Sequence, residues 1–240
     1  MGRPRTKHRR KALVIFSGGQ DSTTCLFWAK QKFDVVALTF NYGQRHAAEI
    51  NAAKKIAELA GVRHEVVDVP GILKSCSPLT DPANALETYS SYEEMDKIIG
   101  DRVELTFVPM RNAFFLTLAA NRAIHQGIFD LVTGVCEMDN ANYPDCRANF
   151  ISHQAKTINM ALGRTAQKFK IHTPLIKLSK KETVLLSKQL TGCWEALAYS
   201  HTCYAGQVPP CGKCHSCILR SFGFKEAGEK DPLVERFKGV

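Results

Sequence analysis

An apolar run that stops at two glycines and restarts as a helix is the feature that most constrains how this chain folds. Residues 11–16 (KALVIF) are apolar and β-branched, as in a buried strand. The polar string SGGQDS follows at residues 17–22, and a helical pattern covers residues 22–31, with Asp21 or Ser22 near its N-cap. Glycine lets a backbone turn tightly and approach a ligand closely. The sequence therefore predicts a strand, a tight turn and a helix in direct succession.

The same alternation of strand and helix patterns continues along the chain. Further strands are predicted at residues 33–40, 62–69, 103–108 and 129–136, and further helices at residues 45–60, 112–126 and 150–162. A later helix should follow an N-cap at Ser179, with Glu182 completing a capping box. Strands that alternate with helices form a parallel sheet. We therefore expect an α/β fold with a twisted parallel sheet of about five strands, helices on both faces, and a ligand at the carboxyl ends of the strands.

Two segments fall outside this alternation. Residues 71–101 contain two prolines, several serines and few aliphatic residues, which indicates an inserted loop that is either a lid or a surface insertion. Residues 1–10 form a basic leader that we expect to be flexible. Residues 11–240 should form a single domain, which includes a loop-rich segment with four cysteines at about residues 193–220.

The positive charge of the chain is concentrated at its N-terminus. The net charge is +9, and six positive charges lie in the first eleven residues, as Arg3, Arg5, Lys7, Arg9, Arg10 and Lys11. The rest is only mildly basic, so we expect no nucleic-acid partner for the folded body, although the leader can contact an anionic surface. No apolar run reaches the roughly 18 residues of a membrane span, and the N-terminus lacks the apolar core of a secretory signal. We therefore expect a cytoplasmic protein with no membrane partner.

Residues 17–24 combine the features of a phosphate-binding turn. Gly18 and Gly19 free the backbone, the first N–H groups of the following helix attract an anion, and hydroxyls such as those of Ser17 and Ser22 add donors. Neither Gly-Lys-Ser/Thr nor G-x-G-x-x-G occurs here, which excludes a Walker A loop and a dinucleotide fingerprint. The string instead resembles the PP-loop of the N-type ATP pyrophosphatases. That resemblance implies that ATP adenylates a substrate and releases pyrophosphate.

Four of the nine cysteines gather near the C-terminus. Two residues separate Cys211 from Cys214 and Cys214 from Cys217, and Cys203 precedes Cys211 by eight positions. Four thiolates at this spacing favour a closed structural Zn²⁺ site that anchors the segment, with an iron–sulfur cluster as the alternative. His215 lies inside the run, but four cysteines already complete a tetrahedral site. The odd number of cysteines and the lack of an export signal argue against a disulfide framework.

Five motifs in order resemble the 7-cyano-7-deazaguanine synthase family over nearly the whole chain. They are VIFSGGQDSTTCL at 14–26, YGQRH at 42–46, VPMRN at 108–112, YPDCR at 143–147 and CGKCHSC at 211–217. The resemblance implies an ATP-dependent C–N ligase of queuosine biosynthesis, which converts 7-carboxy-7-deazaguanine and ammonia to the nitrile through adenylated carboxylate and amide intermediates. It also implies Mg²⁺ bound with ATP and a homodimer. Because the chain has no room for a glutaminase domain, ammonia should enter free.

The resemblance assigns the ATP site to the opening motif. The expected ATP-binding residues are Phe16, Ser17, Gly18, Gly19, Gln20, Asp21, Ser22, Thr23, Thr24, Cys25 and Leu26. Ser17, Asp21 and Ser22 are the expected catalytic residues, because they lie nearest the phosphates.

An arginine is the expected partner of the substrate carboxylate or the α-phosphate, since a guanidinium fork matches both groups. Arg45, Arg111 and Arg147 are the candidates, and Arg147 is preferred because it falls in a loop after a predicted strand. His46 is either a ligand contact or an ordinary first-turn residue. The scattered cysteines, among them Cys25 and Cys146, are expected to pack rather than react.

The chain departs from the family pattern at two places. Ala141-Asn142 stands where the family usually has Ser-Gly, and Met110 stands where a glycine is common. These departures concern fine substrate contacts and leave the reaction class unchanged.

Two other functions are consistent with parts of the sequence. A tRNA-thiolating PP-loop enzyme would use the cysteines for a cluster or sulfur relay, and it predicts an iron–sulfur absorption band and salt-sensitive RNA binding. A zinc-anchored nucleic-acid-binding module without catalysis would bind nucleic acid but not ATP.

Overall fold

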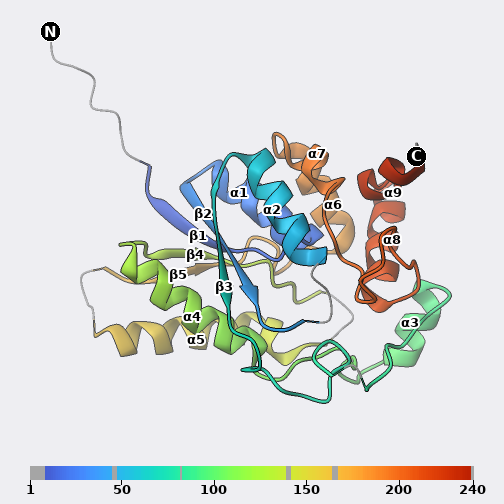
Figure 1. Ribbon diagram of the computed structural model, residues 1–240, viewed down its shortest axis with the longest axis horizontal. Helices are drawn as coiled ribbons and strands as arrows, with labels where there is room; N and C mark the ends of the chain where they lie inside the picture. The colour runs from blue at the N-terminus through green and yellow to red at the C-terminus, as the bar shows by residue number, and fades with distance from the viewer. Residues whose placement is uncertain (1–8, 45–47, 82, 139–141, 164–166, 239–240) are drawn as a thin grey trace, which may run out of the picture.

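The centre of the molecule is a five-stranded sheet whose neighbouring strands all run parallel. The computed structural model describes residues 9–44, 48–81, 83–138, 142–163 and 167–238. The strand order is β3-β2-β1-β4-β5 (Figure 1). The strands are β1 (Lys11–Ile15), β2 (Asp34–Asn41), β3 (Arg63–Asp68), β4 (Asp130–Val132) and β5 (Lys170–His172). The expectation of an α/β fold with a parallel sheet of about five strands is confirmed.

Helices cover both faces of the sheet, as expected. One face carries α1 (Gln20–Lys30) and α2 (Ala48–Ala60), and α6 (Lys180–Gln189) and α7 (Cys193–Leu197) add to the same layer. The other face carries α4 (Arg111–His125) and α5 (Ala148–Leu162) (Figure 1). None of the helices in the described part of the chain is long and apolar enough to cross a membrane.

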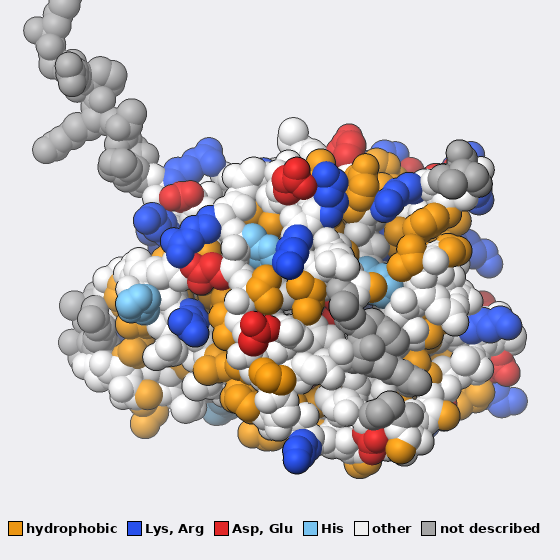
Figure 2. All heavy atoms as spheres, in the orientation of Figure 1, with side chains coloured by type: hydrophobic (Ala, Val, Ile, Leu, Met, Phe, Trp, Pro, Cys, Tyr) orange, Lys and Arg blue, Asp and Glu red, His pale blue; other side chains and the backbone are white. Residues whose placement is uncertain are grey.

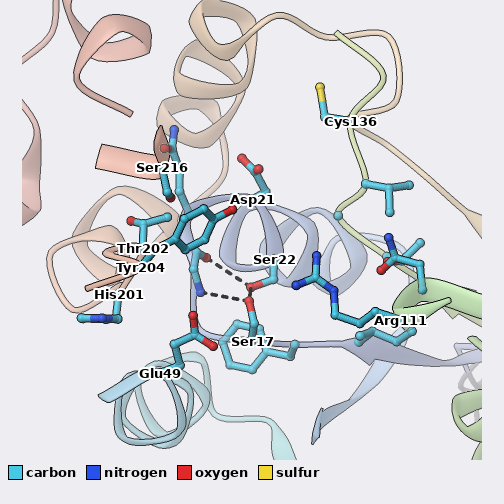
Figure 3. A pocket seen from close by; sticks show the side chains of 18 of the residues that line it. Ser17, Asp21, Ser22, Glu49, Arg111, Cys136, His201, Thr202, Tyr204 and Ser216 are labelled. Atoms are coloured by element: carbon cyan, nitrogen blue, oxygen red, sulfur yellow. Dashed lines mark hydrogen bonds between the residues drawn. The ribbon is translucent and has the colours of Figure 1, made fainter. Parts of the chain in front are cut away.

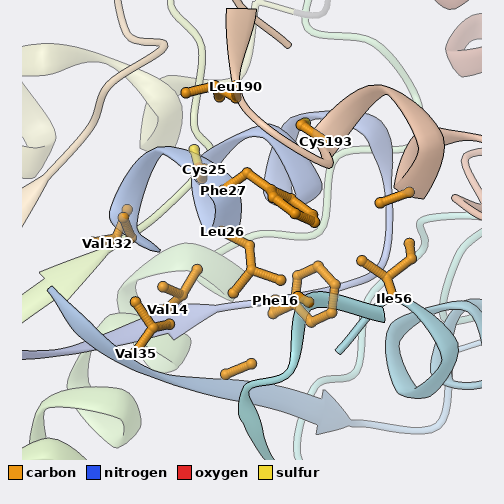
Figure 4. Packing of buried hydrophobic residues seen from close by; sticks show 14 of the residues in the cluster. Val14, Phe16, Cys25, Leu26, Phe27, Val35, Ile56, Val132, Leu190 and Cys193 are labelled. Atoms are coloured by element: carbon orange, nitrogen blue, oxygen red, sulfur yellow. The ribbon is translucent and has the colours of Figure 1, made fainter. Parts of the chain in front are cut away.

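The two cores follow from the alternation of side chains along each strand. Ala12 and Val14 of β1 point toward the α1 layer, whereas Leu13 between them points toward α4. Figure 4 shows the first core, in which Val14, Phe16 and Leu26 converge between β1 and α1. Fully burying one such side chain contributes about 1.5–3 kcal/mol. Because helices cover both faces of the sheet, the sequences of its central strands are almost continuously apolar.

One predicted strand is wrong. Residues 103–108 form turns, and the fifth strand is β5. The alternation of apolar and polar residues predicts a strand with its apolar side chains buried, but here the polar side chains are buried. Glu104 is buried, whereas Val103 and Leu105 are 38% and 49% exposed. The Glu104 carboxylate accepts a hydrogen bond from the backbone N–H of Thr106 at 2.7 Å. A side chain therefore satisfies a backbone group that a strand partner would otherwise pair.

The limits of several predicted elements also shift. Helix α1 begins at Gln20 with Gly19 as its N-cap, before the predicted Asp21 or Ser22, and no side chain caps it. Strand β4 ends at Val132, before the predicted 136, and residues 133–136 continue as a loop. The capping box of Ser179 and Glu182 at the start of α6 is confirmed. The predicted start of the second helix at residue 45 lies outside the described residues.

The segment 71–101 and the C-terminal region contain more helix than expected. Helix α3 (Tyr92–Ile99) lies within the supposed loop and packs on α8 (His215–Ala227), where the rings of Tyr92 and Phe222 stack at 3.6 Å. Helix α9 (Pro232–Lys238) follows α8. Residues 72–81 and 83–91 do lack helix and strand, and Leu79 among them reaches the central cavity described below.

The end of the basic leader is attached to the sheet. Arg10 forms an ion pair with Asp130 at 3.1 Å, and His172 contacts the same carboxylate at 2.7 Å. Asp130 is buried at the start of β4, so these two partners, the second of which ends β5, satisfy its charge. Residues 9 and 10 are thus part of the folded body, while residues 1–8 lie outside the described residues.

Candidate active site

The turn between β1 and α1 is built around hydroxyls and a glycine with positive φ. Gly18 has φ = +81°, and a Cβ at this position would lie 2.6 Å from the backbone nitrogen of Ala53, so both the conformation and the packing against α2 require glycine. The Ser17 and Ser22 hydroxyls lie 3.1 Å apart, and Ser17 Oγ accepts from the Gly19 N–H at 3.3 Å (Figure 3). The first residues of α1, where a helix has no intrahelical partners for its N–H groups, line the carboxyl edge of the sheet.

This turn forms one wall of a cavity of about 290 Å³ at the carboxyl ends of the strands. Other walls come from the end of β2, the start of α4, residues 133–136, residues 201–204 and the start of α8. The expected ATP-binding residues that line the cavity are Phe16, Ser17, Gly19, Gln20, Asp21 and Ser22. All three expected catalytic residues of the turn are thus brought to one surface.

The remaining expected ATP-binding residues do not line the cavity. They are Gly18, Thr23, Thr24, Cys25 and Leu26. Gly18 is pressed against α2, and the other four lie beyond the first turn of α1, where the helix carries them into the core with no exposed surface. Burial raises the pKa of the Cys25 thiol well above its usual value, which supports a packing role. The part of these five residues in ATP binding stays a prediction.

Asp21 forms an ion pair that the sequence did not reveal. Lys180, the first residue of α6, places its Nζ 2.6 Å from Asp21 Oδ2, and its side chain is only 9% exposed. Lys180 also lines the cavity. The only nearby sequence signal was the capping box at Ser179, which fixes the start of α6 but says nothing about what its first side chain contacts. The pair places a cation beside the phosphate-binding turn.

Of the two candidate arginines that the structure describes, Arg111 lines the cavity. It begins α4, and it interacts electrostatically with Tyr42, Tyr143 and Tyr204, all of which line the same space. Glu49 of α2 lies close to Ser17 (Figure 3). Burial raises the pKa of Glu49 to about 7, although the positive charge of Arg111 opposes this rise. The sequence did not single out Glu49 or the tyrosines.

Arg147 lies outside the cavity wall. Its guanidinium donates to the Glu137 carbonyl at 3.0 Å and to Asn142 Oδ1 at 3.3 Å. These bonds hold the loop before α5. The role of Arg147 in substrate binding stays a prediction. Arg45 and His46 lie outside the described residues.

Two residues of the motif YPDCR, Asp145 and Cys146, connect this loop to the start of α4. Asp145 accepts hydrogen bonds from the backbone and side chain of Asn112 at 3.1 and 3.0 Å, which fixes this loop to the start of α4. Cys146 lines the cavity, and its sulfur accepts from Asn112 Nδ2 at 3.4 Å. The two motifs VPMRN and YPDCR are therefore joined by Asn112.

The four clustered cysteines meet in space. The sulfur atoms of Cys203, Cys211, Cys214 and Cys217 all lie within 4.8 Å of one another, in a mostly buried setting. Hydrogen bonds from the Cys214 and Cys217 thiols lower the pKa of the Cys203 thiol, and the same bonds raise the pKa of the two donor thiols, so the negative charge is centred on Cys203. This donor set fits a metal that prefers sulfur ligands.

The cysteine segment is attached directly to the phosphate-binding turn. The His201 N–H donates to the Gly18 carbonyl at 2.9 Å, and Cys203 and Tyr204 line the cavity. Arg220 of α8 secures the same loop, because it donates to the hydroxyls of Ser200 and Thr202 at 2.8 Å each. A metal in the cluster would therefore stabilise part of the cavity wall as well as the C-terminal segment.

Comparison with known proteins agrees with this geometry. The family described as "Queuosine biosynthesis protein QueC" matches residues 11–228. Two curated relatives, from Chromobacterium violaceum and Gloeobacter violaceus, are both named 7-cyano-7-deazaguanine synthase. The first is 50% identical over 94% of each chain, and the second is 49% identical over 93% of this chain and 95% of its own.

A solved structure, the U34-tRNA thiolase NcsA from Methanococcus maripaludis with its [4Fe-4S] cluster, is only distantly similar. It has 19% identity and a TM-score of 0.44, and the match covers 79% of this chain and 60% of that chain. Neither its cluster nor its reaction transfers to this chain at that distance. The match over residues 11–228, together with relatives about half identical along nearly their whole length, shows that the chain belongs to the QueC family of queuosine biosynthesis proteins.

Proposed function

We propose that this protein is an ATP-dependent ligase that converts 7-carboxy-7-deazaguanine and ammonia to 7-cyano-7-deazaguanine in queuosine biosynthesis. The observation that carries the proposal is the shared name of curated relatives that are up to 50% identical over nearly the full length of both chains. A phosphate-binding turn that opens into a cavity at the carboxyl edge of a parallel sheet supports it. AMP and pyrophosphate are the other products.

The first half of the reaction activates the substrate carboxylate. A carboxylate oxygen attacks the α-phosphorus of ATP, which forms an acyl adenylate and releases pyrophosphate. Ammonia then attacks the acyl carbon, AMP departs with the bonding electrons, and loss of a proton from nitrogen leaves the amide. The N–H groups at the start of α1 and the hydroxyls of Ser17 and Ser22 would stabilise the charge that develops on pyrophosphate.

The second half repeats the activation on the amide. The amide oxygen attacks the α-phosphorus of a second ATP, and pyrophosphate leaves again. Loss of the remaining nitrogen-bound protons and departure of AMP then create the carbon–nitrogen triple bond. Neither half needs a side-chain nucleophile, so the chain must position the substrates, stabilise charge and exclude water.

The roles of individual residues follow from their positions. Lys180, held by Asp21, would place a positive charge on the ATP phosphates, and Arg111 would pair with the substrate carboxylate or the α-phosphate. These assignments are supported by the 2.6 Å ion pair and by the position of both cations in the cavity wall. Arg147 would take this role only if its bonds to Glu137 and Asn142 broke.

Two metals belong to the proposal. A structural Zn²⁺ would be held by Cys203, Cys211, Cys214 and Cys217, and the convergence of four sulfurs supports this assignment over a site with open positions. ATP is expected to bind as its Mg²⁺ complex, in which the metal neutralises phosphate charge. A cytoplasmic homodimer completes the proposal, on the strength of the family resemblance and the sequence composition.

A tRNA-modifying role is the alternative, and the distribution of charge on the surface argues against it. On the face shown in Figure 2, Lys and Arg side chains are interspersed with Asp and Glu rather than gathered into one patch. Binding to RNA depends on such a patch, since neutralising phosphates supplies most of the affinity.

A single reaction tests the proposal. Purified protein is mixed with ATP, Mg²⁺, ammonium and 7-carboxy-7-deazaguanine, and the nitrile, the amide and AMP are measured by mass spectrometry. We expect nitrile and AMP, with no nitrile when ammonium is omitted. Ser17→Ala or Asp21→Ala should abolish AMP formation while the fold is retained. ATP binding without AMP formation from this substrate would contradict the proposal, and RNA would be the next substrate to add.

A further inference from the structure

His215 is a buried side chain that the metal cluster leaves unused. It is the first residue of α8, between the cluster residues Cys214 and Cys217, and it is only 3% exposed. The group of four converging metal-binding side chains does not include it. Both of its ring nitrogens are buried, and neither has a hydrogen-bond partner among the residues that the structure describes.

A buried imidazole with no partner is costly, so it requires an explanation. Polar groups removed from water normally find a hydrogen-bond partner, and each one left unpaired destabilises the fold. His215 lines the central cavity, so a molecule bound there can supply the missing partner. The sequence places His215 inside a metal motif, whereas the structure directs it to the substrate side of that motif.

The surroundings of His215 suit a flat heterocycle. Tyr143 and Tyr204 line the same cavity and contribute aromatic surface, and Leu219 of α8 adds an apolar side chain. Glu104 and Lys180 are the charged groups that act on His215, one negative and one positive. A ligand site of this kind combines apolar walls with a few fixed polar groups that set orientation.

We propose that His215 contacts the substrate and recognises its deazapurine ring through hydrogen bonds. This inference rests on the proposed function. An uncharged imidazole offers one N–H donor and one nitrogen acceptor. The two nitrogens of His215 point in diverging directions, so each needs its own partner, and a 7-deazaguanine ring carries both a carbonyl acceptor and N–H donors that can serve either one. Phosphate oxygens accept hydrogen bonds but donate none when ionised, so they would leave one nitrogen unpaired.

The assignment also explains how the site selects its substrate. A site built to hydrogen-bond a particular edge rejects a ring that lacks it, because the buried groups of the protein are then left unpaired. The cysteine segment would therefore do more than anchor the C-terminus. It would also fix the position of His215, which binds the substrate ring. Cys214 precedes His215 directly, so the cluster sets where α8 begins.

The test compares two variants that differ in hydrogen bonding. His215→Phe keeps a flat ring but removes both nitrogens, whereas His215→Gln keeps one donor and one acceptor. We expect His215→Phe to raise the KM for 7-carboxy-7-deazaguanine at least about tenfold, with KM for ATP and bound metal unchanged, and His215→Gln to lie between it and the wild type. His153→Phe, at an exposed position on α5, is the matched control and should behave as the wild type.

A second measurement uses the unmodified protein. Adding 7-carboxy-7-deazaguanine without ATP should produce a slowly exchanging imidazole N–H resonance in the NMR spectrum, and this resonance should be missing from His215→Gln. Its absence in the wild type with bound ligand would overturn the proposal even if His215→Phe failed to fold. An unchanged KM for the acid, a selective rise in the KM for ATP, or loss of metal from both variants would also overturn it. If the wild-type protein makes no nitrile at all, the proposed function fails rather than the role of His215.

Discussion

Lys180 Nζ lies 2.6 Å from Asp21 Oδ2, and this ion pair joins two residues that are 159 positions apart. It connects the first turn of α1 to the first residue of α6 at the edge of the cavity. The Lys180 side chain is only 9% exposed, so its charge acts with little screening by water. A cation in this position stabilises negative charge that develops on a departing pyrophosphate.

Removing this cation should therefore impair the reaction far more than the fold. We expect Lys180→Met to lower kcat for AMP formation by at least about a hundredfold, which is typical for the loss of one preorganised charge-stabilising group. The control is Lys188→Met, because Lys188 lies on the same helix as Lys180 and forms an exposed ion pair with Glu229, a residue after α8, at 2.5 Å. Turnover of Lys180→Met within about twofold of the control would remove Lys180 from the mechanism.

Glu49 should make the stability of the free protein fall as pH rises. Burial raises its pKa from 4.5 to about 7, so the folded protein keeps a proton that the unfolded chain has lost between these values. When the native state binds more protons, the free energy of unfolding decreases with increasing pH. Glu49→Gln lacks this titration and should gain thermal stability relative to the wild type as pH rises from 4.5 to 7.

Thermal unfolding of both proteins across this pH range measures the effect. Glu58→Gln is the matched control, since Glu58 lies on the same helix but is exposed. We expect the difference in Tm between Glu49→Gln and the wild type to widen with pH and then level off above about pH 7. A constant difference would show that Glu49 titrates as an ordinary surface carboxylate.

Met110 and Asn142 are the two described non-glycine residues with positive φ, at 64° and 54°. Both lie at the departures from the family pattern that the resemblance led us to expect. Met110 is 68% exposed and gains little from its side chain, so Met110→Gly should relieve a left-handed conformation and stabilise the protein by about 0.5 kcal/mol after the entropy of glycine is counted.

Asn142→Gly should have the opposite effect. The Asn142 amide donates to the carbonyls of Gly100 at 2.9 Å and Arg102 at 3.1 Å, and these bonds compensate for the strained backbone. Losing them should cost about 1 kcal/mol. Urea unfolding of the two variants gives the comparison, and a stabilised Asn142→Gly would mean that the hydrogen bonds contribute nothing.

The four-cysteine cluster should bind one metal that supports both the fold and the cavity wall. Cys214→Ser removes one of the four sulfur ligands, so we expect loss of metal, a lower Tm, and a higher KM for the substrates because Cys203 and Tyr204 line the cavity. Cys76→Ser is the control, since Cys76 is exposed and lies outside the cluster. Elemental analysis should find zinc, and a visible absorption band from iron and sulfide would point to the alternative.

The sequence by itself determined the parts of this protein that depend on local patterns. The strand, glycine turn and helix at residues 11–31 follow from hydrophobic periodicity and from the two glycines. The capping box at Ser179 and the convergence of four cysteines follow from short, fixed spacings. Each of these features is encoded within a few neighbouring residues, so no knowledge of the rest of the chain is needed to recognise it.

The tertiary structure decided what depends on contacts between distant segments. Strand β5 has only three residues and forms because β4 pairs with it. Residues 103–108 look like a strand but turn, because the buried Glu104 carboxylate takes the place of a partner strand. Lys180 meets Asp21, and His215 lines the cavity and stays outside the group of four cysteines, only because α6 and α8 pack beside the phosphate-binding turn. Such pairings depend on long-range packing, which no local pattern contains.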